Sequence, residues 1–521
     1  MSDPVPASTP ARARVQPLLL LVLTLAALVA WSIGMEYNVL VASATHSIAR
    51  FSNYVSPLAL DKTRSTDDVY PEELFSKDWV DAVPVKDMTH LSTLHIACAR
   101  YKESVIPWDI TWDGKGPEVL INETDPQAFN KLLQCPDVDI FVPSGVRSFG
   151  YCEDAVAYTK FMRGRMLPKW VLEKNFTDPE TGRTDISYHE MCPETPVLFL
   201  NHYWEGVRDD PKWPATKPTF LMPNIEMYEL DATHYNRADV VICKTMVCDK
   251  YLRKWLAQEG NPTNTQVIYS RHTSSNLASF ARVNLGDDAI ASKNFSDPKF
   301  VHIVGGSVFK ATGKVLECWL SRPDLPLIDI YIAEELYNGA YKKRFDDHIK
   351  ASRNVKLHPG RVDSVALGKI VAEAAFFICP SIQEGYGHYI NQARAAGGLV
   401  VTPDVAPMNE LITPKSGVLL RADTRSDEEQ FLGGKSKLAN GLRNVEGFVA
   451  SFSSGDICKA VDSIVFNLTP EERERRAERA RQQYYFDTVY FAEKMQELRV
   501  WGRRKTNLRR ETARPSFETS N

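Results

Sequence analysis

The sequence carries no excess of charge of either sign. Its 521 residues include 62 Lys and Arg and 66 Asp and Glu, which gives a formal net charge of -4 at pH 7. A nucleic-acid-binding chain shows a basic excess that clusters on one face of the folded protein. The balance of charges therefore excludes nucleic acid as an expected partner.

Metal-ligand motifs are also lacking. The nine cysteines do not show the two closely spaced ligand pairs of a zinc site, and His189-Glu190 begins a zinc-protease pattern without its second histidine. We expect no metal at these residues. Because nine is odd, at least one cysteine stays unpaired in an oxidising compartment. Cys98, Cys243 and Cys379 lie in apolar runs, and we expect them to be buried as small hydrophobic residues.

Charge is absent altogether between Arg14 and Glu36. The 21 residues 15–35 match the roughly 20 apolar residues that cross a bilayer as a helix. A cleavable signal peptide is the alternative, since Ala42-Ser43-Ala44 resembles a cleavage site. The apolar run is longer than the usual 7–15 or so residues of a signal peptide and ends well before that site. The sequence therefore predicts an uncleaved signal-anchor at 15–35.

The basic residues predict the orientation of this anchor. Arg12 and Arg14 precede it, whereas the first basic residues after it are Arg50 and Lys62. The positive-inside rule then places a tail, 1–14, in the cytosol and the rest in the Golgi or endoplasmic reticulum lumen, as in a type II glycoprotein. Four N-glycosylation sequons agree with a lumenal location: Asn122, Asn175, Asn294 and Asn467. The cytosolic face of the endoplasmic reticulum remains the alternative.

Two groups of short apolar runs follow a polar stretch at 36–85, which suits a stem. The runs are rich in β-branched residues and alternate with helix-length segments, which is typical of parallel sheets. A turn-rich segment at about 280–297 separates the groups. The pattern predicts an α/β fold with two Rossmann-like lobes, 86–280 and 298–465, and a ligand cleft between them. The expected strands are 94–98, 139–142, 197–200, 219–222, 239–243 and 267–269, then 300–304, 328–332, 355–357, 375–378 and 399–401.

The end of the chain predicts one long helix. Thr469-Pro470 suits an N-cap and first helical position, so we expect a helix over 470–504. Residues 505–521 lack apolar periodicity, and we expect them to be disordered.

Polar residues follow the expected strands of the first lobe. Ligands of open parallel sheets bind outside the carboxyl ends of the strands. Each of these residues alone is an ordinary polar loop residue, but together they form a candidate cleft wall: Asn201, His202, Asn224, Glu226, Lys244 and Arg271.

The most informative segment is 379–401, which reads as strand, glycine-rich loop, helix and strand. The loop Glu384-Gly385-Tyr386-Gly387 opens a helix whose free N–H groups suit a pyrophosphate. These residues resemble the donor-binding lobe of retaining glycosyltransferases of family 4, which have the GT-B fold. The matching positions are Pro380-Ser381, Glu384-Gly385-Tyr386-Gly387, Ala393, Ala395, Gly397 and Val400-Val401.

The resemblance covers about 298–465 and implies a site. Glu384 would lie beside the donor sugar as the catalytic residue, and Gly385, Tyr386, Gly387 and His388 would contact the donor. Gln392 stands where the family has a second glutamate that holds the ribose. An amide can still accept from one hydroxyl and donate to another, so Gln392 is a weakened ribose contact.

A second segment resembles the family's glycine turn. Gly305, Gly306 and Ser307 match the turn, and Lys310 matches a lysine that neutralises the donor diphosphate. Gly306 occupies a position that is basic in the family, so one phosphate cation is either missing or supplied from elsewhere, with Lys314 and Arg271 as the candidates. The resemblance implies a nucleotide-sugar donor, retention at the anomeric carbon, no metal cofactor and a final helix that crosses back to the first lobe. It identifies no acceptor.

Two rival interpretations remain. Asp137-Val-Asp139 is the one tempting motif for a metal-dependent transferase of another fold, although such short motifs are weak. The departures at Gly306 and Gln392 also fit a degenerate protein that binds sugar or nucleotide sugar without turnover.

Overall fold

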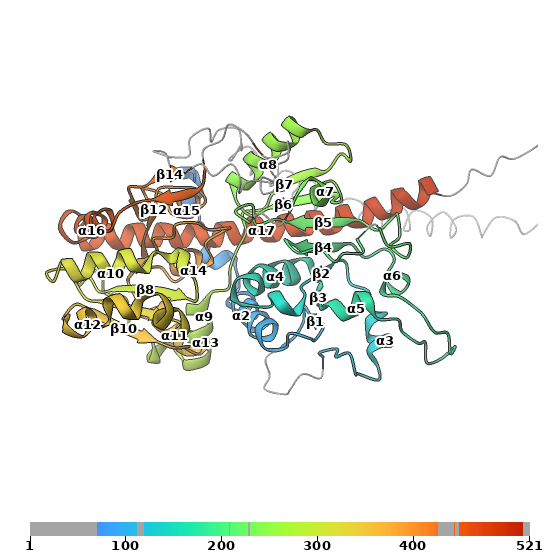
Figure 1. Cartoon of the computed structure of the whole chain (residues 1–521), viewed down its shortest axis with the longest axis horizontal. Helices are drawn as coiled ribbons and strands as arrows, with labels where there is room; N and C mark the ends of the chain where they lie inside the picture. Colours follow the sequence, from blue (N-terminus) through green and yellow to red (C-terminus); the bar gives the residue numbers. More distant parts are fainter. Residues whose placement is uncertain are drawn as a thin grey trace, which may run out of the picture. The chain divides into compact units, whose positions relative to one another are not determined.

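The structure, a computed structural model, describes residues 70–111, 119–207, 209–227, 230–425, 442 and 447–513. These residues form two α/β lobes, each built on a mainly parallel sheet (Figure 1). This is the two-lobed arrangement of a GT-B fold, as the sequence predicts. The predicted anchor and tail at 1–35 lie outside the described residues. Within those described, no helix has both the length and the apolar character to cross a membrane.

The first lobe contains a seven-stranded sheet in the order β1-β3-β2-β4-β5-β6-β7. Only β1 pairs antiparallel, with β3. The strands are β1 (Ile106–Pro107), β2 (Asp139–Phe141), β3 (Arg165–Leu167), β4 (Val197–Leu200), β5 (Thr219–Met222), β6 (Val240–Cys243) and β7 (Gln266–Tyr269). The helices are α2 (Val85–Arg100), α3 (Ala128–Leu132), α4 (Phe149–Met162), α5 (Lys169–Glu173), α6 (Tyr188–Met191), α7 (Ala232–Tyr235) and α8 (Met246–Glu259).

One expected strand is wrong, because 94–98 lies within helix α2. Met88, Leu91, Leu94 and Cys98 are fully buried, and they recur every three or four residues. This is the buried face of a helix. A five-residue apolar run is too short to distinguish it from a strand.

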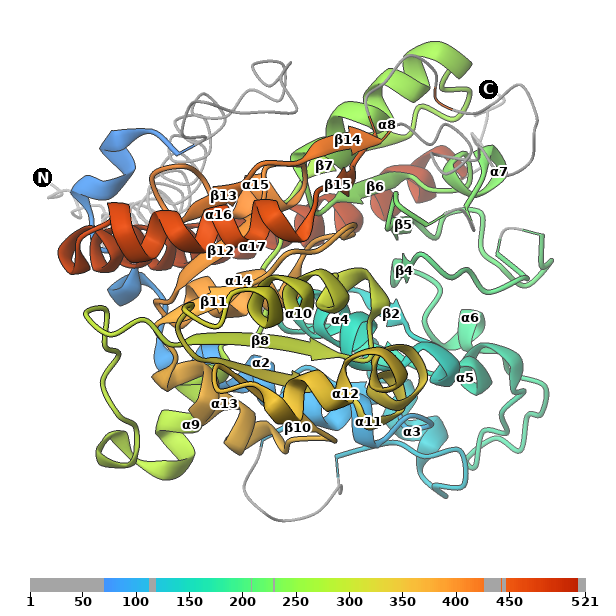
Figure 2. The same cartoon turned by 60° about the vertical axis from the view of Figure 1, so that its left-hand side comes forward.

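The second lobe contains a six-stranded, wholly parallel sheet in the order β10-β9-β8-β11-β12-β13, which is the Rossmann order. Figure 2 shows α10 and α12 in front of it. The strands are β8 (Phe300–Gly305), β9 (Ile328–Ile332), β10 (Val355–Pro359), β11 (Phe376–Ile378), β12 (Leu399–Pro403) and β13 (Val418–Leu420), with a separate antiparallel pair β14 (Asp423–Arg425) and β15 (Val449–Ser451). The helices are α10 (Thr312–Ser321), α11 (Glu334–Leu336), α12 (Lys342–Ala351), α13 (Ser364–Glu373), α14 (His388–Ala395), α15 (Met408–Leu411) and α16 (Ser454–Asp462).

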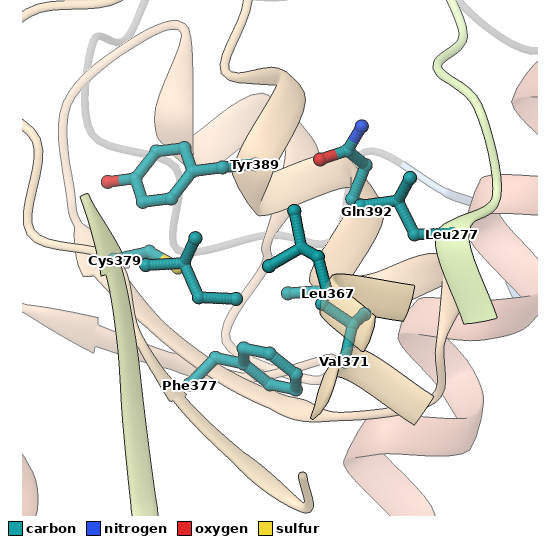
Figure 3. A pocket seen from close by; sticks show the side chains of 9 residues that line it. Leu277, Leu367, Val371, Phe377, Cys379, Tyr389 and Gln392 are labelled. Atoms are coloured by element: carbon teal, nitrogen blue, oxygen red, sulfur yellow. The ribbon is translucent and has the colours of Figure 1, made fainter. Parts of the chain in front are cut away.

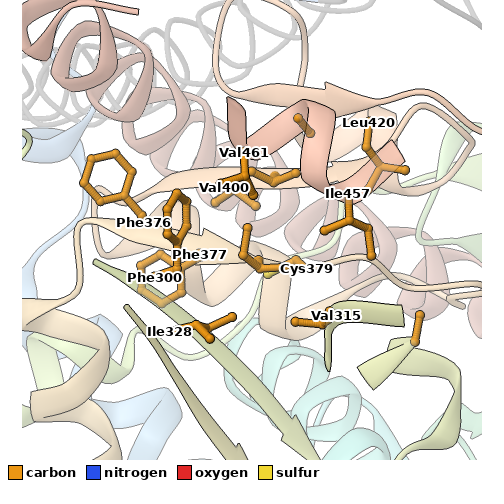
Figure 4. Close-up of a cluster of buried hydrophobic side chains, with 14 of the residues drawn as sticks. Phe300, Val315, Ile328, Phe376, Phe377, Cys379, Val400, Leu420, Ile457 and Val461 are labelled. Atoms are coloured by element: carbon orange, nitrogen blue, oxygen red, sulfur yellow. The ribbon is translucent and has the colours of Figure 1, made fainter. Parts of the chain in front are cut away.

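The core of this lobe packs one face of the sheet against α10 and α16. Phe300 and Phe376 are paired positions on neighbouring strands and belong to one buried cluster with Val315 of α10 and Ile457 of α16 (Figure 4). All four side chains are fully buried. The continuous apolar runs of these strands therefore serve a sheet that is covered by helices.

The predicted linker contains helix α9 (Leu277–Leu285), which packs on α13 of the second lobe. Asn276 caps α9 by accepting a hydrogen bond from the Ser279 amide at 3.0 Å. The contact with α13 is close, because a Cβ added at Gly368 would lie 2.5 Å from the Leu277 carbonyl oxygen.

We therefore expect Gly368→Ala to destabilise the protein. The methyl group would meet backbone, and overpacking of this kind costs about 1–3 kcal/mol. The control is Gly339→Ala, whose added Cβ has no neighbour within 4 Å. Denaturant unfolding should show a lower free energy of unfolding for Gly368→Ala and no such loss for Gly339→Ala. Equal stabilities of the two variants would contradict the packing of α9 on α13.

Helix α17 (Pro470–Ala513) runs along both lobes (Figure 1). Near its start, the Arg473 guanidinium donates to the Ile464 carbonyl at 3.0 Å in the second lobe. Near its end, Arg499 pairs with Asp137 of the first lobe. The helix continues to Ala513, beyond the predicted end at 504 and into the predicted disordered tail.

Part of the predicted stem, 70–84, packs against α17. The ring centres of Trp79 and Phe486 lie 5.0 Å apart in an edge-to-face arrangement, and Glu72 forms an ion pair with Arg479 at 3.0 Å. Tyr70 is buried and donates its hydroxyl to Asp487 at 2.6 Å. The stem prediction therefore extends too far along the chain.

Eight of the nine cysteines form disulfides. Cys98 and Cys243 are buried, as expected, but each is bonded to a second cysteine, which the sequence analysis does not predict. Cys379 is a free, buried thiol, as expected. The disulfide of Cys98 forms because α2 packs on α4, which brings distant cysteines together. The pairs are Cys98–Cys152, Cys135–Cys192, Cys243–Cys248 and Cys318–Cys458.

Candidate functional site

The order of the second sheet places β8 beside β11, where the direction of the strand connections reverses. Ligands of open α/β sheets bind at such a point, outside the carboxyl ends of the strands. The glycine turn follows β8 and the glycine loop follows β11. A hydrogen bond of 2.8 Å from the Ile382 amide to the Phe309 carbonyl joins the two segments.

Lys310 and Glu384 meet between these two segments. Lys310 Nζ donates to Glu384 Oε1, and the Ser381 hydroxyl donates to the same oxygen. The ammonium also lies 3.6 Å from the ring centre of Tyr389, whose hydroxyl is 2.5 Å from that of Ser381. The structure therefore brings the two residues that the sequence singles out into one ion pair.

Open space borders the glycine turn. Gly305 has a φ of 60°, which a side chain rarely adopts, and a Cβ added at Gly305 or Gly306 would meet nothing within 4 Å. Ser307 leads into a short 3-10 turn, Val308–Lys310. A ligand could approach the backbone of this turn without displacing a side chain.

The predicted cleft is occupied by direct contacts between the lobes. His388 Nε2 of α14 lies 3.0 Å from Asp154 Oδ1 of α4, and Gln392 donates to Glu153 of the same helix at 3.0 Å. The Tyr386 hydroxyl donates to the His272 carbonyl. The segment 379–401 therefore contacts the first lobe, and we call this set of residues the inter-lobe contact.

Most of the predicted cleft wall lies near this contact. Lys244 Nζ donates to Asp154 at 2.9 Å and to Asn224 Oδ1 at 2.6 Å. The Glu226 carboxyl lies against Gly385, since a Cβ there would be 2.2 Å from Glu226 Oε1. Asn201 and His202 contact neighbouring residues of the first lobe. Asn201 Oδ1 accepts from the Asn224 amide at 3.1 Å, and His202 Nε2 lies 3.0 Å from the Tyr151 hydroxyl.

Neither expected second cation faces the glycine turn. The Arg271 guanidinium is buried and pairs with Asp487 of α17 at 2.8 Å. Lys314 donates to the Phe452 carbonyl at 2.7 Å. Lys310 is therefore the cation that the structure places beside the turn and Glu384.

Asp154, His272 and His388 have donor atoms within 4.8 Å of one another. Two imidazoles and a carboxylate suit zinc. However, Lys244 Nζ already lies 2.9 Å from the Asp154 carboxylate, where its charge would repel a metal ion. Burial lowers the pKa of His272 to about 4, so Lys244, and not this neutral ring, supplies the positive charge that pairs with Asp154 at pH 7. We therefore assign these residues to the inter-lobe contact.

The hydrogen-bond and ion-pair partners of Asp137 and Asp139 contradict a metal site at this rival motif. The buried Asp139 carboxylate accepts from Arg165 at 2.9 Å and from the Tyr188 hydroxyl at 2.5 Å. Asp137 pairs with Arg499 and Arg503 of α17. Both carboxylates already have cationic partners and serve the packing of the first lobe.

A small cavity lies beneath Tyr389 and Gln392 (Figure 3). Its volume is about 30 Å³, and its other walls include Leu277, Leu367 and Phe377. Ligand pockets usually measure about 300–1,000 Å³. The cavity therefore belongs to the packing of α14 and is too small for a donor.

The comparisons with known proteins give structural similarity alone. No protein-family model matches the chain, and no curated protein matches it. The chain is similar to sucrose-phosphate synthase from Thermosynechococcus elongatus, with 14% identity, a TM-score of 0.46, and coverage of 71% of this chain and 99% of that one. It is similar to Anabaena HepE in complex with UDP and glucose, with 15% identity, a TM-score of 0.44, and coverage of 69% and 98%.

A third similar structure is the GtfA/B complex, with 13% identity and a TM-score of 0.41. The match covers 63% of this chain and 63% of that chain. These similar structures are GT-B glycosyltransferases.

Proposed function

We propose that this chain is a glycosyltransferase that transfers a sugar from a nucleotide-sugar donor to an acceptor, with retention and without a metal. The observation that carries the proposal is the meeting of Lys310 and Glu384, 74 residues apart, between two glycine-rich turns. Each turn follows a strand at the point where an open α/β sheet binds its ligand.

Lys310 and the backbone would hold the donor diphosphate. The amides of the glycine turn and of the first turn of α14 would present N–H groups to an anion. These donors stabilise the charge that develops on the leaving nucleotide, and removing one such donor costs about 2.7–4 kcal/mol of transition-state stabilisation in other enzymes. Lys310 would neutralise part of the diphosphate charge, and the proposal assigns the rest of the stabilisation to the backbone amides and not to a metal ion.

Glu384 would act on the sugar. The transition state of glycosyl transfer resembles an oxocarbenium ion, which a nearby carboxylate stabilises. Without donor, Lys310 and Glu384 neutralise each other. A bound diphosphate would draw Lys310 toward its oxygens and leave the carboxylate for the sugar.

One observation favours a second candidate, a degenerate protein that binds sugar or nucleotide sugar without turnover. The Gln392 amide, which stands at the expected ribose contact, donates instead to Glu153 and to Ser275. Ribose binding would have to replace these hydrogen bonds. Binding of a nucleotide sugar with no release of nucleotide would support this candidate.

The test is nucleotide release from a panel of UDP-, GDP- and CMP-linked sugars by the purified full-length chain, with and without EDTA. We expect release from one donor that EDTA does not change and that Glu384→Ala abolishes. The control is Glu335→Ala on α11, an exposed glutamate of the same lobe. Release that EDTA abolishes would overturn the metal-free mechanism.

We further propose that residues 15–35 anchor the protein, with the catalytic lobes in the Golgi or endoplasmic reticulum lumen. The acceptor would then be a glycan, protein or lipid of that compartment. The uncharged run and the four sequons support this placement. A shift of the cellular protein on glycosidase treatment is expected, whereas its absence would favour the cytosolic face of the endoplasmic reticulum.

A further inference from the structure

Glu226 lies in a turn that follows β5 of the first lobe. The Met227 amide donates to the Asn224 carbonyl at 2.9 Å and closes this turn. The carboxyl group reaches the second lobe, where a Cβ added at Gly385 would lie 2.2 Å from Oε1. Glu226 is thus a first-lobe carboxyl placed directly against the loop that carries Glu384.

The other carboxylates near the boundary between the lobes already have partners. Glu384 accepts from Lys310, Asp154 accepts from Lys244, and Glu153 accepts from Ser275 at 2.6 Å and from Gln392. In contrast, Glu226 Oε2 is buried and has no hydrogen-bond partner among the described residues. A buried carboxyl oxygen without a partner is costly unless it carries a proton or meets a ligand.

The surroundings of Glu226 place its titration near neutral pH. Burial is the main cause that raises its pKa to about 7, and the negative charges of Glu384 and Asp154 act in the same direction. Lys244 opposes them. The remaining neighbours, Asn224 and Gln383, are uncharged, and Lys310 is paired with Glu384. Such a group can both take up and release a proton at the working pH.

We propose that Glu226 accepts the proton of the acceptor hydroxyl during sugar transfer. The proposal rests on the proposed function. The acceptor oxygen forms a bond to the anomeric carbon as its O–H bond breaks, and the proton passes to Glu226 Oε2. The bond from the anomeric carbon to the diphosphate breaks, and its electron pair leaves with the nucleotide.

The position of Glu226 suits this role. It lies on the lobe opposite the glycine turn, so an acceptor bound to the first lobe meets the donor between Glu226 and Glu384. Separation of the inter-lobe contact admits the acceptor and exposes Oε2. After transfer, the proton passes from Glu226 to water and restores the carboxylate.

The test uses water as the acceptor and the full-length chain. Nucleotide release from UDP-glucose, UDP-N-acetylglucosamine and GDP-mannose is measured between about pH 5.5 and 8.5, across the titration of the base. Because the base acts as the carboxylate, wild-type kcat should rise with pH through about 7. Glu226→Gln should lower kcat by about 10²–10⁴-fold, leave KM unchanged and remove this rise. Glu226→Asp should retain the rise at a lower kcat.

Glu410→Gln is the matched control. Glu410 is also a buried carboxyl with a pKa raised to about 7 by burial, but it accepts from the Met246 and Val247 amides at the start of α8. This variant should keep the rise of kcat with pH. Persistence of the rise in Glu226→Gln would overturn the assignment. Absence of nucleotide release by the wild-type chain from any donor would overturn the proposed function, and the assignment with it.

Discussion

Lys310→Ala is expected to lower nucleotide release by about 10²–10³-fold, the usual effect of removing one donor that stabilises a developing anion. Lys310 is the cation beside the glycine turn, and it pairs with Glu384. Since its contribution grows as the nucleotide leaves, the loss should fall mainly on kcat. Steady-state kinetics with the donor identified by the panel measure both parameters.

Lys314→Ala provides the matched control for this prediction. Lys314 lies four residues after Lys310 in the sequence, on α10, and donates to the Phe452 carbonyl. Its removal should change kcat by less than about tenfold, as expected for a residue that does not touch the transition state. A larger loss at Lys314 than at Lys310 would show that the donor diphosphate binds elsewhere.

Asp487→Ala is expected to destabilise the protein by about 3–5 kcal/mol, the cost of leaving buried charges without their partner. Asp487 lies on α17 and pairs with Arg271 of the first lobe at 2.8 Å and Arg394 of the second lobe at 2.5 Å. It also accepts from the Tyr70 hydroxyl at 2.6 Å. All four side chains are at most 5% exposed.

Denaturant unfolding measures the loss of stability in Asp487→Ala and compares it with the loss in a variant of an ion pair at the surface. Asp462 pairs with Arg322 at 3.1 Å, and both side chains are 33% exposed. Exposed pairs contribute about 0–1 kcal/mol, so Asp462→Ala should be nearly neutral. Equal losses in the two variants would contradict the assignment of Asp487 as the residue that joins both lobes to α17.

The sequence predicts the fold well where strands are rich in β-branched or aromatic residues. The expected runs 197–200 and 219–222 coincide with β4 and β5. Strand β3 (Arg165–Leu167) was not predicted, because its three residues carry no β-branched side chain and no alternation. The run 94–98 has the composition of a strand, and the helical spacing becomes visible only over the whole of α2.

The candidate site is predictable only where its residues are close in sequence. The motif at 379–401 and the turn at 305–310 identify Glu384 and Lys310, but not that the two form an ion pair. Glu153 and Asp154 were missed, because their partners Gln392 and His388 lie 239 and 234 residues away. No local pattern distinguishes such a pair from two ordinary acidic residues on a helix.

Arg271 is a further residue whose contacts the local sequence does not predict. A basic residue after a strand is a reasonable candidate for phosphate binding. In the structure, its backbone adopts a φ of 49°, and its side chain packs among Tyr70, Tyr269 and Phe486. The position of α17, which comes from the far end of the chain, decides this outcome.

Hydrogen-deuterium exchange of the full-length chain with saturating UDP or GDP tests the location of the donor site most directly. Binding at the proposed site should slow exchange of the amides at 305–311 and 384–388, because the diphosphate would accept hydrogen bonds from them. Protection confined to the first lobe, or no protection by any nucleotide, would contradict a donor site between the two glycine-rich turns.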